Sequence, residues 1–111
     1  MASEESEGSG RVLNVLNEVL IQQLEIGGRT FLGVRIELGA PLLLIKGEKG
    51  YLGCGYFSLE VANSVGDALA IVRGVSSFDD MLNAEVREVS ERARELGVEE
   101  GMKGREALMR L

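Results

Sequence analysis

The segment that decides the fold is Thr30-Phe-Leu-Gly-Val-Arg-Ile-Glu-Leu38, in which apolar residues alternate with polar or small ones from Leu32 onward. Because successive side chains of a β-strand point to opposite faces, this period of two predicts a strand. Gly27 and Gly28 precede it and are typical of a hairpin turn, so the partner strand should come from the residues just upstream.

Upstream of these glycines, two patterns overlap. Leu16, Leu20 and Leu24 fall near helical spacing, whereas Leu20, Leu24 and Ile26 also share the parity of a strand. Because the strand over residues 30–38 needs a partner across the turn, we predict a strand over about residues 18–26.

The N-terminal end of the chain has a different character. Its first ten residues are small, polar and acidic, so we expect them to be disordered. We assign residues 1–17 to a mostly disordered leader, and for residues 11–17 the sequence leaves helix, strand and disorder open. Residues 18–111 then fit a single domain by their length.

Downstream, short apolar runs alternate with segments that carry helix caps. We predict strands over residues 42–46, 51–56 and 67–73. We also predict four helices: one begins at Ser58, a short one begins near Ser77, and the other two span residues 84–96 and 105–111. Gly47 and Gly50 bound a tight turn, where we expect positive φ angles. The predicted fold class is α+β. It has a mainly antiparallel sheet of about five strands with an N-terminal hairpin used for oligomerisation, one short helix after the fourth strand and C-terminal helices packed on the sheet.

Composition argues against several classes of function. The chain has 111 residues, a net charge of −6 and no histidine, which removes the commonest general base and metal ligand. Its acidity offers no attraction for phosphate backbones or anionic lipid, and no apolar run approaches the roughly 20 residues of a membrane helix. We therefore expect no nucleic acid, membrane, metal or cofactor. A single cysteine forms no internal disulfide, which favours a cytoplasmic protein.

Cys54 is the candidate catalytic residue, because it lies shortly before the helix expected at Ser58. If its sulfur points towards that helix N-terminus, the helix dipole favours the thiolate, so that a nucleophile can form without histidine. The competing interpretation is a small buried hydrophobe, since cysteine is among the residue types most often buried.

Two glycine-rich turns are candidates for binding a small anionic ligand, because backbone amides at a helix start can hold a carboxylate or phosphate. The first turn leads into a helix and comprises Gly50, Tyr51, Gly53, Gly55 and Ser58. The second offers Lys103 and Arg105 at the start of the last helix. Packing glycines and an ordinary turn are the competing interpretations, and the first segment matches no phosphate-loop motif.

The hairpin carries more apolar side chains than one domain can cover. One face is expected to cover the domain's own helices with Leu20, Leu24, Ile26, Leu32, Val34, Ile36 and Leu38. The other side, with Val19, Ile21 and Phe31, then needs another subunit, since it would otherwise promote aggregation. We predict a homo-oligomer, a tetramer of paired dimers, assembled through residues 18–38.

Three segments together resemble a known family. They are Gly50-Tyr51-x-x-Cys54-Gly55, Val72-Arg73-Gly74 and Gly101-Met-x-Gly-Arg-x-Ala-Leu108. In combination they resemble the YunC-like proteins of bacteria and archaea, the domain of unknown function 1805, over roughly residues 18–111. The resemblance implies a small α+β domain whose N-terminal β region mediates tetramerisation, and it favours a strand over residues 18–26. It implies no established activity.

Two functions therefore stay open. The first is a non-catalytic oligomeric module that binds a small ligand or another protein, which the absence of histidine and of clustered acids favours. The second is a thiol-dependent enzyme or redox sensor that uses Cys54. Whether the protein is an enzyme is not decided by the sequence.

Overall fold

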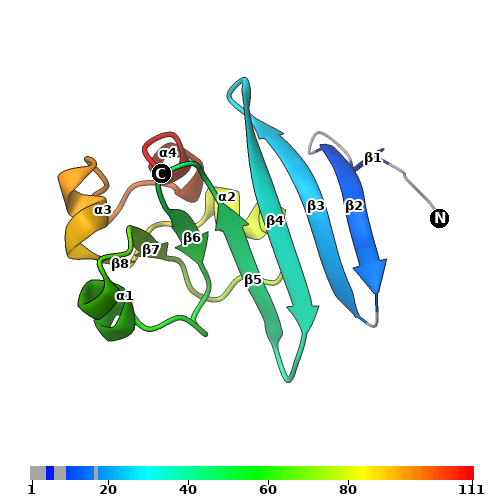
Figure 1. The fold of residues 1–111 in the computed structure, drawn as a ribbon, viewed down its shortest axis with the longest axis horizontal. Coiled ribbons are helices and arrows are strands. Elements are labelled where there is room, and N and C mark those ends of the chain that lie inside the picture. Colours follow the sequence, from blue (N-terminus) through cyan, green and yellow to red (C-terminus); the bar gives the residue numbers. More distant parts are fainter. Residues whose placement is uncertain (1–4, 7–9, 17) are drawn as a thin grey trace.

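The computed structural model describes residues 5–6, 10–16 and 18–111. Over these residues the chain forms a sheet with the strand order β1-β2-β3-β4-β5-β6-β7-β8, and all neighbouring strands are antiparallel except the parallel pair β6 and β7 (Figure 1). The strands are β1 (Glu5–Ser6), β2 (Gly10–Leu16), β3 (Val19–Ile26), β4 (Arg29–Glu37), β5 (Pro41–Lys46), β6 (Tyr51–Gly53), β7 (Leu69–Ile71) and β8 (Glu88–Val89). The helices are α1 (Leu59–Val65), α2 (Phe78–Asn83), α3 (Glu91–Glu95) and α4 (Gly104–Leu108). The α+β class that the sequence predicts is confirmed.

The N-terminal half is a meander in which β2 to β5 pair in succession (Figure 1). Gly27 and Gly28 connect β3 to β4 with φ angles of +58° and +79°, which glycine adopts without steric cost. The predicted hairpin is therefore confirmed. Within the predicted leader, where the sequence leaves the structure of residues 11–17 open, Gly10–Leu16 forms β2 and extends the sheet along the edge of β3. Residues 1–4, 7–9 and 17 lie outside the described residues.

The hairpin turn sets a register that divides the apolar side chains differently from our expectation. Ile26 pairs with Arg29 and Leu24 pairs with Phe31, so even-numbered residues of β3 lie opposite odd-numbered residues of β4. Leu24, Ile26 and Phe31 are buried in the core, and Val34 lies on the opposite face of the sheet. The single apolar face predicted for both strands is therefore wrong, because a two-residue turn reverses the parity between them.

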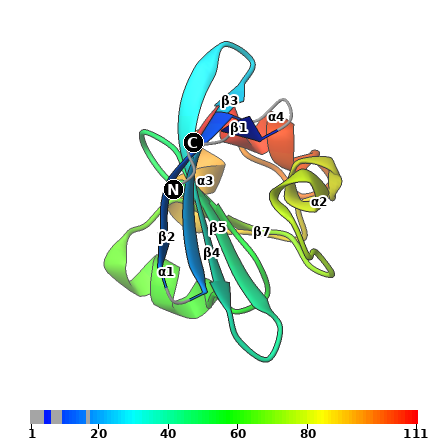
Figure 2. The same ribbon diagram turned by 90° about the vertical axis from the view of Figure 1, so that its right-hand side faces the viewer.

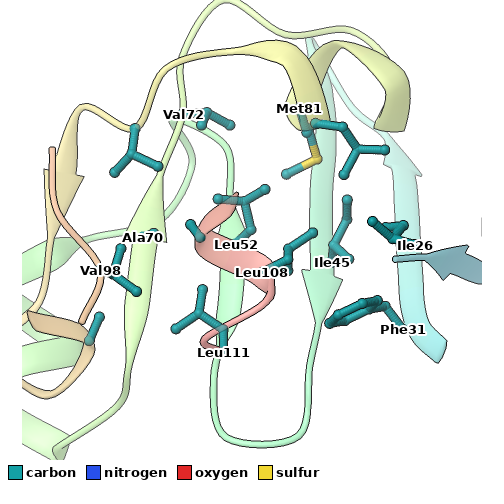
Figure 3. Packing of buried hydrophobic residues seen from close by; sticks show 14 of the residues in the cluster. Ile26, Phe31, Ile45, Leu52, Ala70, Val72, Met81, Val98, Leu108 and Leu111 are labelled. Carbon is teal, nitrogen blue, oxygen red and sulfur yellow. The ribbon is translucent and has the colours of Figure 1, made fainter. Parts of the chain in front are cut away.

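Helices cover the two faces of the sheet unequally. Figure 2 shows α2 and α4 on one side and α1 on the other. Under α2 and α4 lies the main core, drawn in Figure 3, to which the strands and helices contribute Ile26, Phe31, Ile45, Leu52, Ala70, Val72, Met81, Leu108 and Leu111. A smaller cluster of Ala62, Leu69 and Ile71 lies at α1 and β7. β7 is buried on both faces, with Ala70 in the main core and Leu69 and Ile71 in the smaller cluster. Complete burial of one large aliphatic side chain contributes about 1.5–3 kcal/mol, so this strand stabilises the C-terminal half.

The caps predicted for two short helices are confirmed. The Ser58 Oγ accepts the N–H of Val61 at the start of α1, and Gly66 ends this helix with a φ angle of +80°. Ser77 caps α2 in the same way. Val65, in the last turn of α1, is 64% exposed. None of the helices within the described ranges is long and apolar enough to cross a membrane.

The helix predicted over residues 84–96 is wrong. Arg87 and Ser90 donate their backbone N–H groups to carbonyls of β7, so this stretch contains the edge strand β8 and only Glu91–Glu95 is helical. Ser90 caps α3. Pairing with the open edge of β7 overrides the helical spacing of the apolar residues, because propensity is a weak determinant beside tertiary contacts.

Candidate functional site

Cys54 follows directly after β6, which ends three residues earlier than predicted. The residue is 4% exposed. Its Sγ accepts the N–H of Leu43 at 3.3 Å, and its own N–H donates to the Leu43 carbonyl oxygen at 3.1 Å. The thiol therefore lies against the backbone of β5 and offers almost no surface to a reactant.

We expect this burial to control the reactivity of Cys54. In the native protein, alkylation by iodoacetamide should be slower than in the guanidinium-unfolded chain by roughly tenfold or more, because local opening has to precede the reaction. The time course of labelling, followed by mass spectrometry, measures both rates. Equal rates would contradict the prediction and favour the thiol-dependent function.

The glycines around Cys54 are required by close packing. A Cβ atom at Gly50 would lie 2.4 Å from the carbonyl oxygen of Ala68, and one at Gly53 would lie 2.6 Å from the ring of Phe57. The positive φ angles expected for Gly47 and Gly50 are wrong, since neither residue is in the left-handed region. These glycines let β6 approach its neighbours closely, as interior glycines of a strand often do.

The two predicted anion-binding turns do not form one site. The Lys103 Nζ donates to the backbone oxygen of Asn83 at 3.3 Å, and the Arg105 guanidinium donates to the Asn83 Oδ1 at 3.2 Å. Both lie at the start of α4. In the first turn, Gly55 is exposed and the hydroxyl of Ser58 serves as the cap of α1. Only Gly50 and Tyr51 from the predicted set line the pocket that the structure contains beside β6.

This pocket has a volume of about 400 Å³, within the usual range for a small-molecule site. Its apolar lining comes from Leu44, Gly50, Tyr51, Phe57, Gly66 and Ala68, and its charged lining from Lys46, Lys49, Asp67 and Arg92. The register places Lys46 and Tyr51 side by side on adjacent strands. We call it the Tyr51 pocket.

Sequence reasoning missed the charged residues of the Tyr51 pocket. They come from the end of β5, the β5–β6 turn, the loop before β7 and α3, so only the folded sheet brings them together. The one local signal was Gly50, which the sequence identified as a point of turning and which allows β6 to approach Ala68. In the part of the chain that the structure describes, no three acidic or cysteine side chains converge as a metal site requires.

Tyr51 joins the apolar and charged parts of its pocket. Its ring meets that of Phe57 edge to face, with 5.8 Å between the ring centroids and 66° between the planes. Its hydroxyl donates to the Asp67 Oδ2 at 3.2 Å. Burial, followed by the hydrogen bond to the Asp67 carboxylate, raises the pKa of the Tyr51 phenol above its ordinary value, because both disfavour the phenolate.

We expect this raised pKa to appear in the alkaline titration of the protein. The folded pKa of Tyr51 exceeds the unfolded value of 10.0, so its contribution to stability is complete below that pH and is lost as the pH rises through the folded pKa. In Tyr51→Phe, the tyrosinate absorbance step above pH 10.0 should disappear. Loss of a step at or below that pH would contradict the assignment.

Together, the sheet, its helices and the pocket define a small α+β domain in which an N-terminal meander joins a C-terminal half with a ligand-sized pocket. Comparison with known proteins then gives the family. Residues 53–111 match the family described as Domain of unknown function (DUF1805). The chain belongs to this family, which confirms the resemblance seen in its sequence.

Two relatives share most of the chain. It is 30% identical over 98 residues to the uncharacterized protein YunC of Bacillus subtilis (strain 168), a match that covers 84% of this chain and 97% of YunC. Its fold is similar to the crystal structure of a protein of unknown function, TA1206, from Thermoplasma acidophilum. That match has a TM-score of 0.81 and 42% identity, and it covers 88% of this chain and 99% of the other.

Proposed function

We propose that this protein is a non-catalytic, homo-oligomeric binding module that assembles through the β3–β4 hairpin. The observation that carries the proposal is an apolar sheet face over β3, β4 and β5. The apolar residues that share this face by register are Val19, Ile21, Leu32, Val34, Ile36, Leu42 and Leu44. We call it the hairpin face.

The hairpin face is continuous, and the helices of the chain leave it uncovered. Val34 pairs with Ile21 on one side and with Leu44 on the other, so the side chains form adjacent rows. Leu42, at the start of β5, packs against the edge of the main core, and the other six residues belong to neither buried cluster. Leu32 is 37% exposed, and the remaining residues of the face are half-buried. The helix on this side of the sheet, α1, packs instead with Leu69 and Ile71 of β7 (Figure 2).

A second copy of the chain suits this surface better than solvent does. The centre of the hairpin face is apolar, and the polar side chains of Gln23, Glu25, Thr30 and Lys46 gather at one end. An apolar centre with a polar rim is typical of interfaces between identical subunits, which pair the same patch with itself around a two-fold axis. Two such dimers make the tetramer that the sequence predicted.

The non-catalytic part of the proposal is supported by the chemistry of the side chains. The chain has no histidine, and its one cysteine is buried against β5. Histidine, the most frequent general base, is thus absent and the thiol nucleophile is covered, whereas the Tyr51 pocket provides a place for a ligand.

The mass of the protein in solution tests the assembly. We expect sedimentation equilibrium at micromolar concentration to give about four times the chain mass of 12.0 kDa. A dimer would retain the interface and contradict the tetramer. A particle of 12.0 kDa would overturn the proposal.

A further inference from the structure

We infer that the Tyr51 pocket binds a small organic anion, a molecule with a flat apolar body and one carboxylate or phosphate group. This inference rests on the binding part of the proposed function and names the class of ligand. Leu44 and Lys46 lie where the hairpin face borders the pocket, so the inference requires that a subunit packed on that face leaves the mouth of the pocket open. Binding and assembly are measured separately.

The pocket has a local charge opposite to that of the whole chain. The net charge of the protein is −6, yet Lys46, Lys49 and Arg92 face the single carboxylate of Asp67 here. Cations gathered around a concave surface raise the local potential and concentrate anions there, even when the rest of the molecule is acidic. The charge therefore selects an anionic ligand.

Among the residues that the structure describes, two of these cations lack an acidic partner. The Lys46 Nζ donates to the Gly47 carbonyl oxygen at 2.8 Å, which is a neutral acceptor and leaves the charge uncompensated. Within residues 18–111, the side chain of Lys49 has no hydrogen bond or ion pair. Arg92 bonds Glu95 at 3.0 Å in an exposed pair, and such pairs contribute little and exchange readily.

The carboxylate in the pocket is already bonded. Asp67 accepts the hydroxyl of Tyr51, and this hydrogen bond holds the aromatic ring in place beside the cations. The Asp67 side chain therefore holds the Tyr51 ring in the wall of the pocket. Its one negative charge is exceeded by the two positive charges of Lys46 and Lys49.

The depth of each side chain then determines the shape of the ligand. Leu44, Tyr51 and Phe57 are half-buried and apolar, whereas Lys46 and Lys49 are exposed. The floor of the pocket is thus apolar and its rim is cationic. An inorganic anion would leave the apolar floor in contact with water, and a neutral molecule would form no ion pair with the lysines of the rim. The pocket therefore fits a ligand with an apolar body and an anionic group.

Four probes test this class: phenylacetate, phenyl phosphate, neutral phenylacetamide and inorganic phosphate. Each is titrated into isotope-labelled protein of residues 1–111, and amide TROSY spectra report the site. At least one of the two aromatic anions should shift the amides of Gly50, Gly66 and Ala68, roughly tenfold more tightly than phenylacetamide or inorganic phosphate does. Which aromatic anion binds more tightly identifies the head group.

A double variant tests whether the two lysines bind the anion. The protein that carries both Lys46→Ala and Lys49→Ala should bind the better anion about fivefold or more weakly, because each exposed charge contributes modestly. Arg87→Ala removes one positive charge from an exposed side chain outside the pocket and should change the dissociation constant less than about twofold. Spectra of the free variants verify their folding.

Three results would overturn the inference. They are the absence of shifts at these amides with both aromatic anions, equal binding of phenylacetamide or inorganic phosphate, and unchanged binding by the double lysine variant. The sedimentation mass of the same samples separates these failures from a failure of assembly, since a monomer that binds the anion would contradict only the oligomer.

Discussion

Gly104→Ala is expected to lower the free energy of unfolding by about 3 kcal/mol. A Cβ atom at this position would lie 2.0 Å from the carbonyl oxygen of Met81 and 3.0 Å from the Cδ2 of Leu52. The clash is with backbone at the contact of α2 and α4, so relief requires one helix to move on the core (Figure 3). The N–H of Gly104 also donates to the Ala84 carbonyl oxygen at 2.8 Å, and a shift would lengthen that bond.

Gly39→Ala is the matched control for this prediction. A Cβ atom at Gly39 meets nothing within 4 Å, and its φ angle is outside the left-handed region. The substitution should change stability by less than about 0.5 kcal/mol. Urea unfolding at one fixed protein concentration measures both variants, because the stability of an oligomer depends on concentration. Equal losses for the two would show that helix packing does not require glycine at 104.

Val34→Glu is expected to dissociate the proposed oligomer while leaving the fold of the subunit intact. Val34 lies at the centre of the hairpin face, between Ile21 and Leu44. A carboxylate there would be buried in the interface without a partner, and the resulting cost of several kcal/mol weakens association by roughly a hundredfold or more. In the separated subunit the same side chain faces water, so the strand can still form.

The control for this variant is Val65→Glu, which makes the same chemical change on α1. Val65 is 64% exposed and lies outside the hairpin face, so assembly should persist. Sedimentation velocity compares the two variants, and circular dichroism verifies that both retain their strands. An assembled Val34→Glu protein would place the interface elsewhere.

Local sequence features predicted the parts of the fold that local physics determines. Gly27 and Gly28 adopt the positive φ angles that a two-residue hairpin turn requires. Ser58 and Ser77 satisfy orphan N–H groups at helix starts. Each of these residues forms its turn or cap with neighbours only a few positions away in the sequence, so tertiary structure does not change the local conformation.

Features that depend on distant partners were predicted less well. The spacing of Val86, Val89 and Ala93 suits a helix, but the open edge of β7 draws residues 88–89 into the sheet. Lys46, Asp67 and Arg92 meet only after β6 and β7 pair in parallel around α1. No spacing in the sequence predicts such a cluster, because its members are brought together by the sheet order.

Assembly through the hairpin face is tested most directly by whether its methyl groups contact water in solution. The measurement is the relaxation that a soluble paramagnetic agent causes at isoleucine and valine methyl groups of the native protein. If the face is covered by a second copy, Ile21, Val34 and Ile36 should be protected as well as the buried Ile45 is. Relaxation as fast as that of the exposed Val65 would show that the face is open to water and would contradict the proposed assembly.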